Sequence, residues 1–112
     1  MKNETLRTIA INMYNSAMHH IDNEVYYADS LDDIRTYGCN ETSFEVDGLD
    51  VFIKYDYEFD TQIWKGDASV GCADDVEILN VRVSICDIDI MQDCEDYPVT
   101  AKDIEQINAY AA

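Results

Sequence analysis

Apolar residues recur at every second position from residue 51 to residue 59 of this chain: Val51, Ile53, Tyr55, Tyr57 and Phe59. A period of two is that of a β-strand with one buried face, because successive side chains point to opposite sides. The alternate positions from 50 to 60 are mostly acidic. The sequence therefore predicts a strand with an apolar side and an anionic side.

The neighbouring residues extend this strand into a small sheet. Phe44 and Val46 precede it with the same period, and Asp47-Gly48 between the two runs is a strong hairpin signal. Alternation returns in residues 76 to 85, which predicts a third strand, and a short fourth strand is expected at Ile88 to Ile90.

Residues 60 to 75 carry glycines and aspartates and are predicted to form a loop. Trp64, which lies in this segment, is expected to turn back and cover the edge of the core.

Helices are predicted before and after the strands in the sequence. Residues 4 to 21 carry an apolar stripe at helical spacing: Leu6, Ile9, Ala10, Met13, Tyr14, Ala17 and Ile21. Ser30 with Asp33 resembles a capping box, which predicts a second, short helix stopped by Gly38. Thr100 with Asp103 repeats that pattern after Pro98 and predicts a final helix.

The expected fold is therefore an α+β domain. It consists of a small antiparallel sheet of three to four strands, with the N-terminal and C-terminal helices packed on one of its faces. At 112 residues, with 47% of them hydrophobic, the chain is predicted to be a single domain over 1–112. We found no apolar run near the roughly 20 residues of a membrane span and no signal peptide, so a cytoplasmic location is expected.

Four cysteines, Cys39, Cys72, Cys86 and Cys94, lie 33, 14 and 8 residues apart. This spacing does not predict a zinc site. In a reducing compartment we expect free thiols that pack as small hydrophobic side chains, although the even number would also permit two disulfides.

Charge is the unusual part of the composition: 24 acidic residues against 7 Lys and Arg give a formal net charge of -17. A small domain needs a net charge of only about 2 to 8 to stay soluble. Duplex DNA carries one charge per roughly 1.7 Å, so 17 charges correspond to about 29 Å of duplex. The excess therefore suggests a surface that imitates nucleic acid.

The acidic residues gather in two places. The outward side of the predicted strand carries Asp50, Asp56, Glu58 and Asp60, of which the last three form a row at about 6.6 Å intervals. Residues 83 to 101 contain no Lys or Arg, and a second group of acids accumulates there: Asp87, Asp89, Asp93, Glu95 and Asp96. We take these nine residues as the candidate partner-binding set. Eight tyrosines, several of them beside acids, also favour a basic partner.

No catalytic or metal-binding motif competes with this interpretation. His19 and His20 are adjacent, so they cannot chelate one ion as an i, i+4 pair would. We expect them to lie at the C-terminus of the first helix, where the helix dipole makes histidine favourable. The acids from Asp87 to Glu95 lack the glycine and terminal Glu of a calcium loop. We therefore expect no enzyme, no cofactor and no dedicated metal site.

In size, acidity and lack of catalytic motifs the chain resembles the small acidic inhibitors encoded by bacteriophages and mobile elements, including DNA-mimic anti-restriction proteins and anti-CRISPR proteins. The resemblance implies a non-enzymatic inhibitor of a host defence protein, such as a CRISPR effector, restriction enzyme or other nuclease. Its expected partner is a basic nucleic-acid-binding protein or complex, with no direct binding to nucleic acid or membrane; a homodimer stays open. The alternatives are an acidic protein adapted for solubility or high salt, and a weak divalent-ion module.

Overall fold

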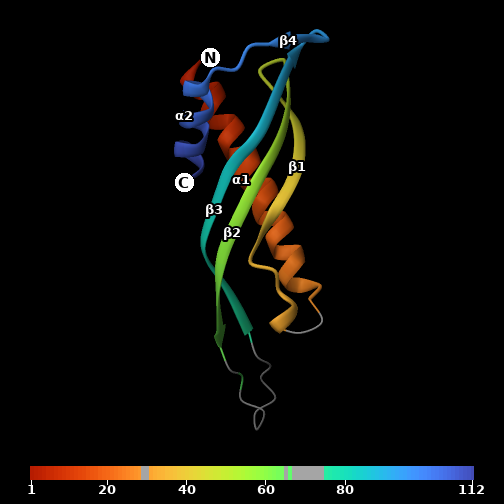
Figure 1. The fold of residues 1–112 in the computed structure, drawn as a ribbon, viewed down its shortest axis with the longest axis vertical. Coiled ribbons are helices and arrows are strands. Elements are labelled where there is room, and N and C mark those ends of the chain that lie inside the picture. The colour runs from red at the N-terminus through yellow and green to blue at the C-terminus, as the bar shows by residue number, and fades with distance from the viewer. Residues whose placement is uncertain (29–30, 65, 67–74) are drawn as a thin grey trace.

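The computed structural model describes residues 1–28, 31–64, 66 and 75–112. Its elements are α1 (Asn3–Tyr26), the 3-10 helix η1 (Leu31–Asp33), β1 (Tyr37–Val46), β2 (Leu49–Trp64), β3 (Asp75–Gln92), β4 (Glu95–Tyr97) and α2 (Ala101–Ala111). Figure 1 shows a long, narrow molecule in which β1, β2 and β3 run roughly along the longest axis. No helix in the described part of the chain is long and apolar enough to cross a membrane.

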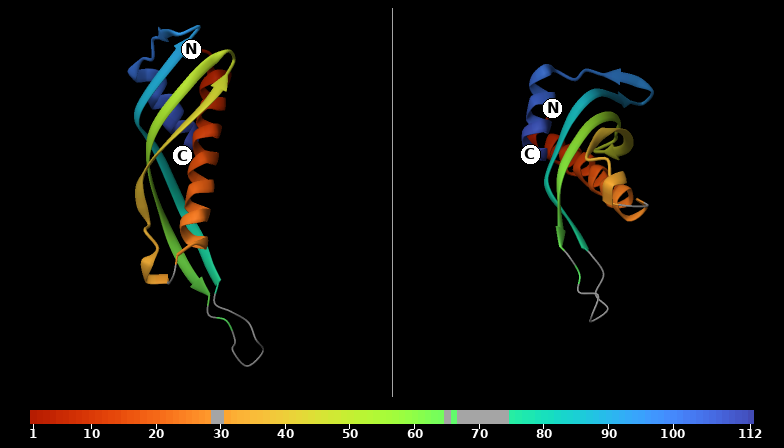
Figure 2. Two further views of the ribbon diagram at one scale, coloured as in Figure 1. Left: turned by 90° about the vertical axis from the view of Figure 1, so that its right-hand side faces the viewer. Right: turned by 60° about the horizontal axis from the view of Figure 1, so that its bottom comes forward.

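The four strands form one antiparallel sheet in the order β1-β2-β3-β4. Both α-helices lie on the same side of this sheet, with α1 in its curved inner face and α2 beside α1 near β3 (Figure 2). The predicted α+β architecture, with terminal helices on a small antiparallel sheet, is confirmed. Among the described residues, no helix lies over the opposite side of the sheet.

Helix α1 forms where the apolar stripe predicts it and buries the residues of that stripe. Leu6, Ile9, Met13 and Ile21 are fully enclosed, together with two alanines that allow close approach to the sheet. The helix continues to Tyr26, five residues past the predicted end. The two histidines therefore do not lie in its last turn, and our interpretation of them as helix-terminal residues is wrong.

Strand β2 supplies the centre of the core. Its odd-numbered residues from Leu49 to Phe59 are buried, and its even-numbered residues from Asp50 to Asp60 are exposed. The hydroxyl of Tyr55 lies 3.1 Å from Ser16 Oγ and accepts a hydrogen bond from Asn40 Nδ2 at 3.2 Å. The fully buried phenol is therefore satisfied by its neighbours, as buried polar groups must be.

Tyr57 completes this inner face. Its hydroxyl lies 3.1 Å from Nε2 of His20, and burial, with Glu24 adding to it, raises the pKa of this phenol above its ordinary value of 10.0. Gly38, which was expected to stop a helix, instead pairs directly with Tyr57 from within β1. A Cβ at residue 38 would lie 2.8 Å from the Tyr57 hydroxyl oxygen, so the glycine makes room for that ring.

The predicted short helix is reduced to η1, while Ser30 lies outside the described residues. A second correction concerns the strands. The predicted third and fourth strands, at 76 to 85 and at Ile88 to Ile90, belong to one strand, β3. The short fourth strand is β4, which follows a two-residue turn at Asp93 and Cys94, both with positive φ. The predicted turn at Asp47-Gly48 is confirmed, with φ of 52° and 79°.

The predicted loop over residues 60 to 75 begins later than expected, because β2 continues to Trp64. Residues 65 and 67–74 lie outside the described part of the chain. Trp64 does not cover the core: its side chain is 54% exposed, and its Nε1 donates a hydrogen bond to Glu77 Oε2 at 2.9 Å.

The final helix begins as predicted. Thr100 Oγ1 accepts a hydrogen bond from the Asp103 amide, and Asp103 Oδ2 accepts one from the Thr100 amide, both at 3.1 Å. This reciprocal capping box satisfies two backbone donors that the helix would otherwise leave unpaired. It fixes where α2 starts and thus how Ile107 enters the core.

The cysteines do not pack as expected. Cys39, Cys86 and Cys94 are free thiols, as predicted, but all three are exposed rather than buried, and Cys72 lies outside the described residues. Cys39 is on the outward side of β1, Cys86 is the extra residue of a bulge in β3, and Cys94 is in a turn. Their strand positions, which spacing alone does not reveal, decide their exposure.

Candidate functional site

The outer side of the sheet, opposite the helices, carries most of the predicted acidic residues. We call it the acidic face and define it by eight exposed side chains: Glu41 and Glu45 of β1, Asp50, Asp56, Glu58 and Asp60 of β2, and Asp87 and Asp89 of β3. Residues directly opposite in a sheet share a face, and the register joins these strands on one side. From Asp50 to Asp60 the face is about 33 Å long, at roughly 3.3 Å per residue.

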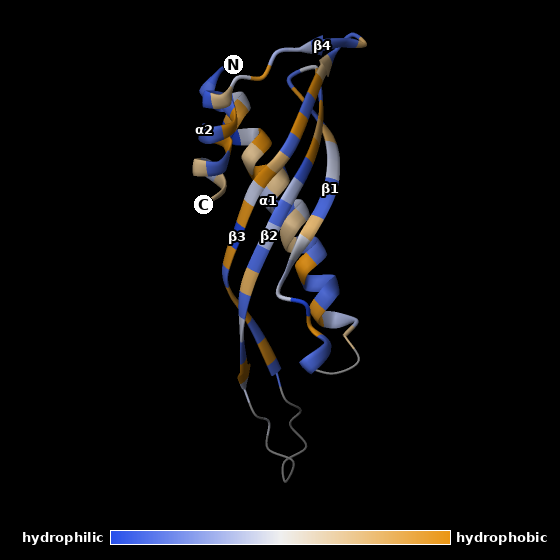
Figure 3. Cartoon of the chain, viewed as in Figure 1, coloured by the Kyte–Doolittle hydropathy of each residue, from blue (hydrophilic) through white to orange (hydrophobic). Residues whose placement is uncertain are grey.

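The alternation that creates this face is visible as bands of blue and orange along β2 and β3 in Figure 3. The four predicted acids of β2 all lie on it, with Asp87 and Asp89 beside them on β3. Asp96 pairs with Met91 and continues the same side on β4. Asp93 lies in the turn, and Glu95 alternates with Asp96 and therefore points to the other side. The predicted second group is thus divided, because a turn and a change of strand interrupt it.

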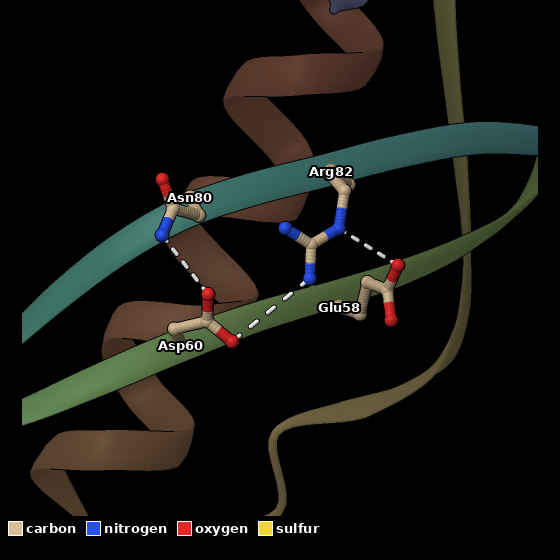
Figure 4. Close-up of polar contacts among 4 residues, drawn as sticks. All are labelled: Glu58, Asp60, Asn80 and Arg82. Atoms are coloured by element: carbon tan, nitrogen blue, oxygen red, sulfur yellow. Dashed lines mark hydrogen bonds and ion pairs between the residues drawn. The ribbon is translucent and has the colours of Figure 1, made fainter.

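Two basic residues lie within the acidic face, and each is placed between acids. Lys54 is directly opposite Glu41 on one neighbouring strand and Asp87 on the other. Arg82 Nε donates a hydrogen bond to Glu58 Oε1 at 2.7 Å, and its Nη2 lies 3.9 Å from Asp60 Oδ1 (Figure 4). Because the hydrogen bond to Glu58 stabilises the charged form, it raises the pKa of the guanidinium.

Asp60 is held from a second side. Asn80, at a bulge in β3 with a φ of 52°, donates a hydrogen bond from Nδ2 to Asp60 Oδ2 at 2.9 Å (Figure 4). Glu58 and Asp60 are therefore oriented by neighbouring side chains. Sequence reasoning did not identify Asn80 and Arg82, because the bulge that places them opposite these acids depends on strand register.

Aromatic side chains also lie among the acids. Tyr55 and Tyr57 alternate with acids in the chain and are buried against the helices, as the period of two predicts. Two exposed aromatics lie on the outer side beside these acids: Tyr37, which pairs with Glu58 and is 68% exposed, and Phe52, which is 47% exposed. A hollow of about 430 Å³ lies on this side, across the start of β1 and the neighbouring parts of β2 and β3, and it is lined in part by Tyr37, Arg82 and Ser84.

The helical side of the molecule has a different balance. With the N-cap Lys2 included, α1 and α2 carry three basic residues and five acidic ones: Lys2, Arg7, Lys102, Glu4, Asp22, Glu24, Asp103 and Glu105. The acidic face carries eight acids with two bases. The excess of acids over bases is therefore larger on the acidic face than on the two helices.

The histidines have structural partners: His20 contacts the Tyr57 hydroxyl, and His19 lies 3.3 Å from the Asn23 amide nitrogen. Within the described residues, no group of three or more His, Cys, Asp or Glu side chains is arranged to hold a metal ion. Comparisons with protein families, curated proteins and solved structures found no match to this chain. The acidic face is thus the candidate site on the strength of its own geometry.

Proposed function

We propose that this protein is a non-enzymatic inhibitor that presents the acidic face in place of nucleic acid and blocks the DNA-binding surface of a host defence protein. The target is a nuclease, restriction enzyme, CRISPR effector or similar complex with a basic groove. The protein acts by occupying that groove, without turnover, in the cytoplasm of a bacterial host.

The observation that carries this proposal is the uncovered, anionic side of the sheet. Along β2, the exposed carboxylates of Asp56, Glu58 and Asp60 follow one another at about 6.6 Å intervals. The face extends over about 33 Å and carries eight acids with two bases, Lys54 and Arg82. The sheet holds the backbone of these residues in place, so binding would not have to order the backbone that carries the acids.

Arg82 and Asn80 support the same function in a different way. They fix Glu58 and Asp60 before any partner arrives, which reduces the side-chain entropy lost on binding. Exposed Phe52 and Tyr37 add flat surfaces on which arginine side chains of a basic groove can stack.

The proposal is tested by recovering the partner from bacterial lysate on tagged protein, at low and at high salt. The test variant neutralises the row of three acids: Asp56→Asn, Glu58→Gln and Asp60→Asn. The matched control neutralises three exposed acids outside the acidic face, Asp22→Asn, Asp32→Asn and Glu105→Gln, and therefore has the same net charge.

We expect the wild type and the control to retain one nucleic-acid-binding complex, identified by mass spectrometry, and the face variant to lose it. Binding should weaken as salt rises, as phosphate contacts do. Equal recovery by both variants, with unchanged circular dichroism, would contradict a role for this face. If the wild type and both variants retain a mixture of basic proteins and lose it equally as salt rises, the binding is only nonspecific charge attraction.

A further inference from the structure

The free edge of β1 is the second unusual surface of this molecule. In the sheet order, β1 is an outer strand, and Figure 1 shows it on the side away from α2. Its ten residues pair with β2 in an unbroken register, without a bulge. The segment contains no proline and no lysine, two residues that commonly protect sheet edges from pairing with another chain.

The hairpin geometry identifies the backbone groups that face outward. A two-residue loop makes Val46 and Leu49 a hydrogen-bonded pair, so the even-numbered residues of β1 bond to β2. The hydrogen bond from the Phe59 amide to the carbonyl of Thr36, which is also even-numbered, agrees with this pattern. The N–H and C=O groups of Tyr37, Cys39, Glu41, Ser43 and Glu45 therefore point to the open edge. Among the described residues, no hydrogen bond to these groups is present.

The opposite edge of the sheet is protected. The outward amide of Ile85 donates a hydrogen bond to Asn108 Oδ1 of α2 at 2.9 Å, β4 pairs with the last residues of β3, and two bulges interrupt the β2–β3 ladder. Among the described residues, the β1 edge has no such side-chain hydrogen bond, no added short strand and no bulge. The difference between the two edges indicates that β1 is left open.

We propose that the β1 edge accepts an extended segment of a basic protein as a fifth strand. Such a strand would place alternate side chains beside Glu41 and Glu45 on the acidic face, where Lys or Arg would form opposite-charge cross-strand pairs. Its other side chains would lie beside Thr42 and Phe44 on the helix side and would be small or apolar. This inference takes the basic nature of the partner from the proposed function and adds a second contact surface.

A second copy of this chain fits the same edge less well. β1 carries two glutamates and no basic residue, and each chain has a net charge of -17. Joining two β1 edges would bring these like charges together in one continuous sheet, which is unfavourable. Charge complementarity therefore favours a basic segment.

The test measures amide hydrogen exchange in the presence of a synthetic peptide of alternating Lys and Thr, as long as β1. In the free protein, the amides of Cys39, Glu41 and Ser43 should exchange faster than those of Asn40 and Thr42. With the peptide bound, the odd-numbered amides should slow by about tenfold or more, the size expected for one added hydrogen bond. The matched control peptide has the same charge but carries N-methyl groups on alternate amides, so it cannot pair with the edge.

Equal slowing by both peptides would show attraction by charge alone and overturn the proposal. Odd-numbered amides that are already protected in the free protein, and more so at higher protein concentration, would show that a second copy occupies the edge and would also overturn it.

A pair of variants tests the edge from the protein side. Ser43→Pro removes an outward N–H without disturbing the bonds to β2, whereas Ser43→Ala keeps that N–H and removes only the hydroxyl. With folding verified by circular dichroism, Ser43→Pro should abolish the peptide-dependent protection and Ser43→Ala should preserve it. Protection unchanged in Ser43→Pro would overturn the proposal.

The two proposals can fail separately. A lysate complex that needs the acidic face but binds Ser43→Pro normally would leave the proposed function intact and remove the edge from it. Protection of the edge by the Lys-Thr peptide, with no complex retained from lysate, would support the edge and contradict the inhibitor.

Discussion

At the scale of single residues, the structure depends on the fit between Gly38 and Tyr57. The tyrosine places a large ring and a hydroxyl on the inner face of the sheet, where His20 and Phe59 contact it. The directly opposite position on β1 must then be small. A glycine inside a strand ordinarily weakens it, but here the absence of a side chain is what allows the ring to be buried.

Gly38→Ala should therefore lower the free energy of unfolding by about 1 to 3 kcal/mol, the range for an overfilled core. In a Tyr57→Phe background the same substitution should be less harmful by about 1 kcal/mol, because the oxygen nearest the new Cβ is gone. Denaturant unfolding of the four proteins in this cycle measures the coupling. An equal loss in both backgrounds would mean that the contact with the tyrosine does not explain the glycine.

At the scale of secondary structure elements, local signals decided some boundaries and long-range packing decided others. Helix α2 begins at its capping box because the hydrogen bonds are between residues three apart. Helix α1 passes its predicted end, since its last turns continue past the buried apolar stripe without a stop signal. The β3 bulges lie where β2 and β3 change register, and they bring Asn80 and Arg82 next to Asp60 and Glu58.

The capping box allows a direct test at this scale. Thr100→Ala should reduce stability by about 1 kcal/mol, because the Asp103 amide loses its acceptor, and amide exchange in the first turn of α2 should accelerate. Thr100→Ser keeps the hydroxyl and serves as the control. A serine variant as unstable as the alanine variant would show that the threonine methyl group, and not the cap, is responsible.

At the scale of the whole molecule, the main property is the excess of negative charge. The two helices with Lys2 carry five acids and three bases, and the acidic face holds eight acids with Lys54 and Arg82 among them. The principal extents are 60 × 23 × 20 Å, so the charges across the short axes lie well within reach of each other at low salt. Self-repulsion must therefore oppose folding.

The melting temperature should rise as NaCl is increased from about 0.01 M to 0.15 M, because the screening length falls from about 30 Å to 8 Å. The variant with Asp56, Glu58 and Asp60 neutralised should show a smaller rise. Replacing Na⁺ with a bulky organic cation distinguishes screening from ion binding, since screening depends only on ionic strength. A flat salt dependence would contradict the repulsion argument, and a requirement for molar salt would favour adaptation to high salt over the inhibitor.

The sequence by itself determined the features that depend on neighbours along the chain. The period-two alternation fixed which side of β2 is acidic, the stripe fixed the buried side of α1, and Asp47-Gly48 and Thr100 fixed a turn and a cap. These are local because each rests on backbone geometry over a few residues.

Only the tertiary structure decided how residues distant in the chain are placed together. It merged two predicted strands into β3, exposed three cysteines and Trp64, and separated Asp93 and Glu95 from the acidic face. It also left β1 as an open edge, a property of strand order and not of β1 itself. The physical reason is that register, bulges and edge position depend on which strands pair, and pairing is set by packing across the whole sheet.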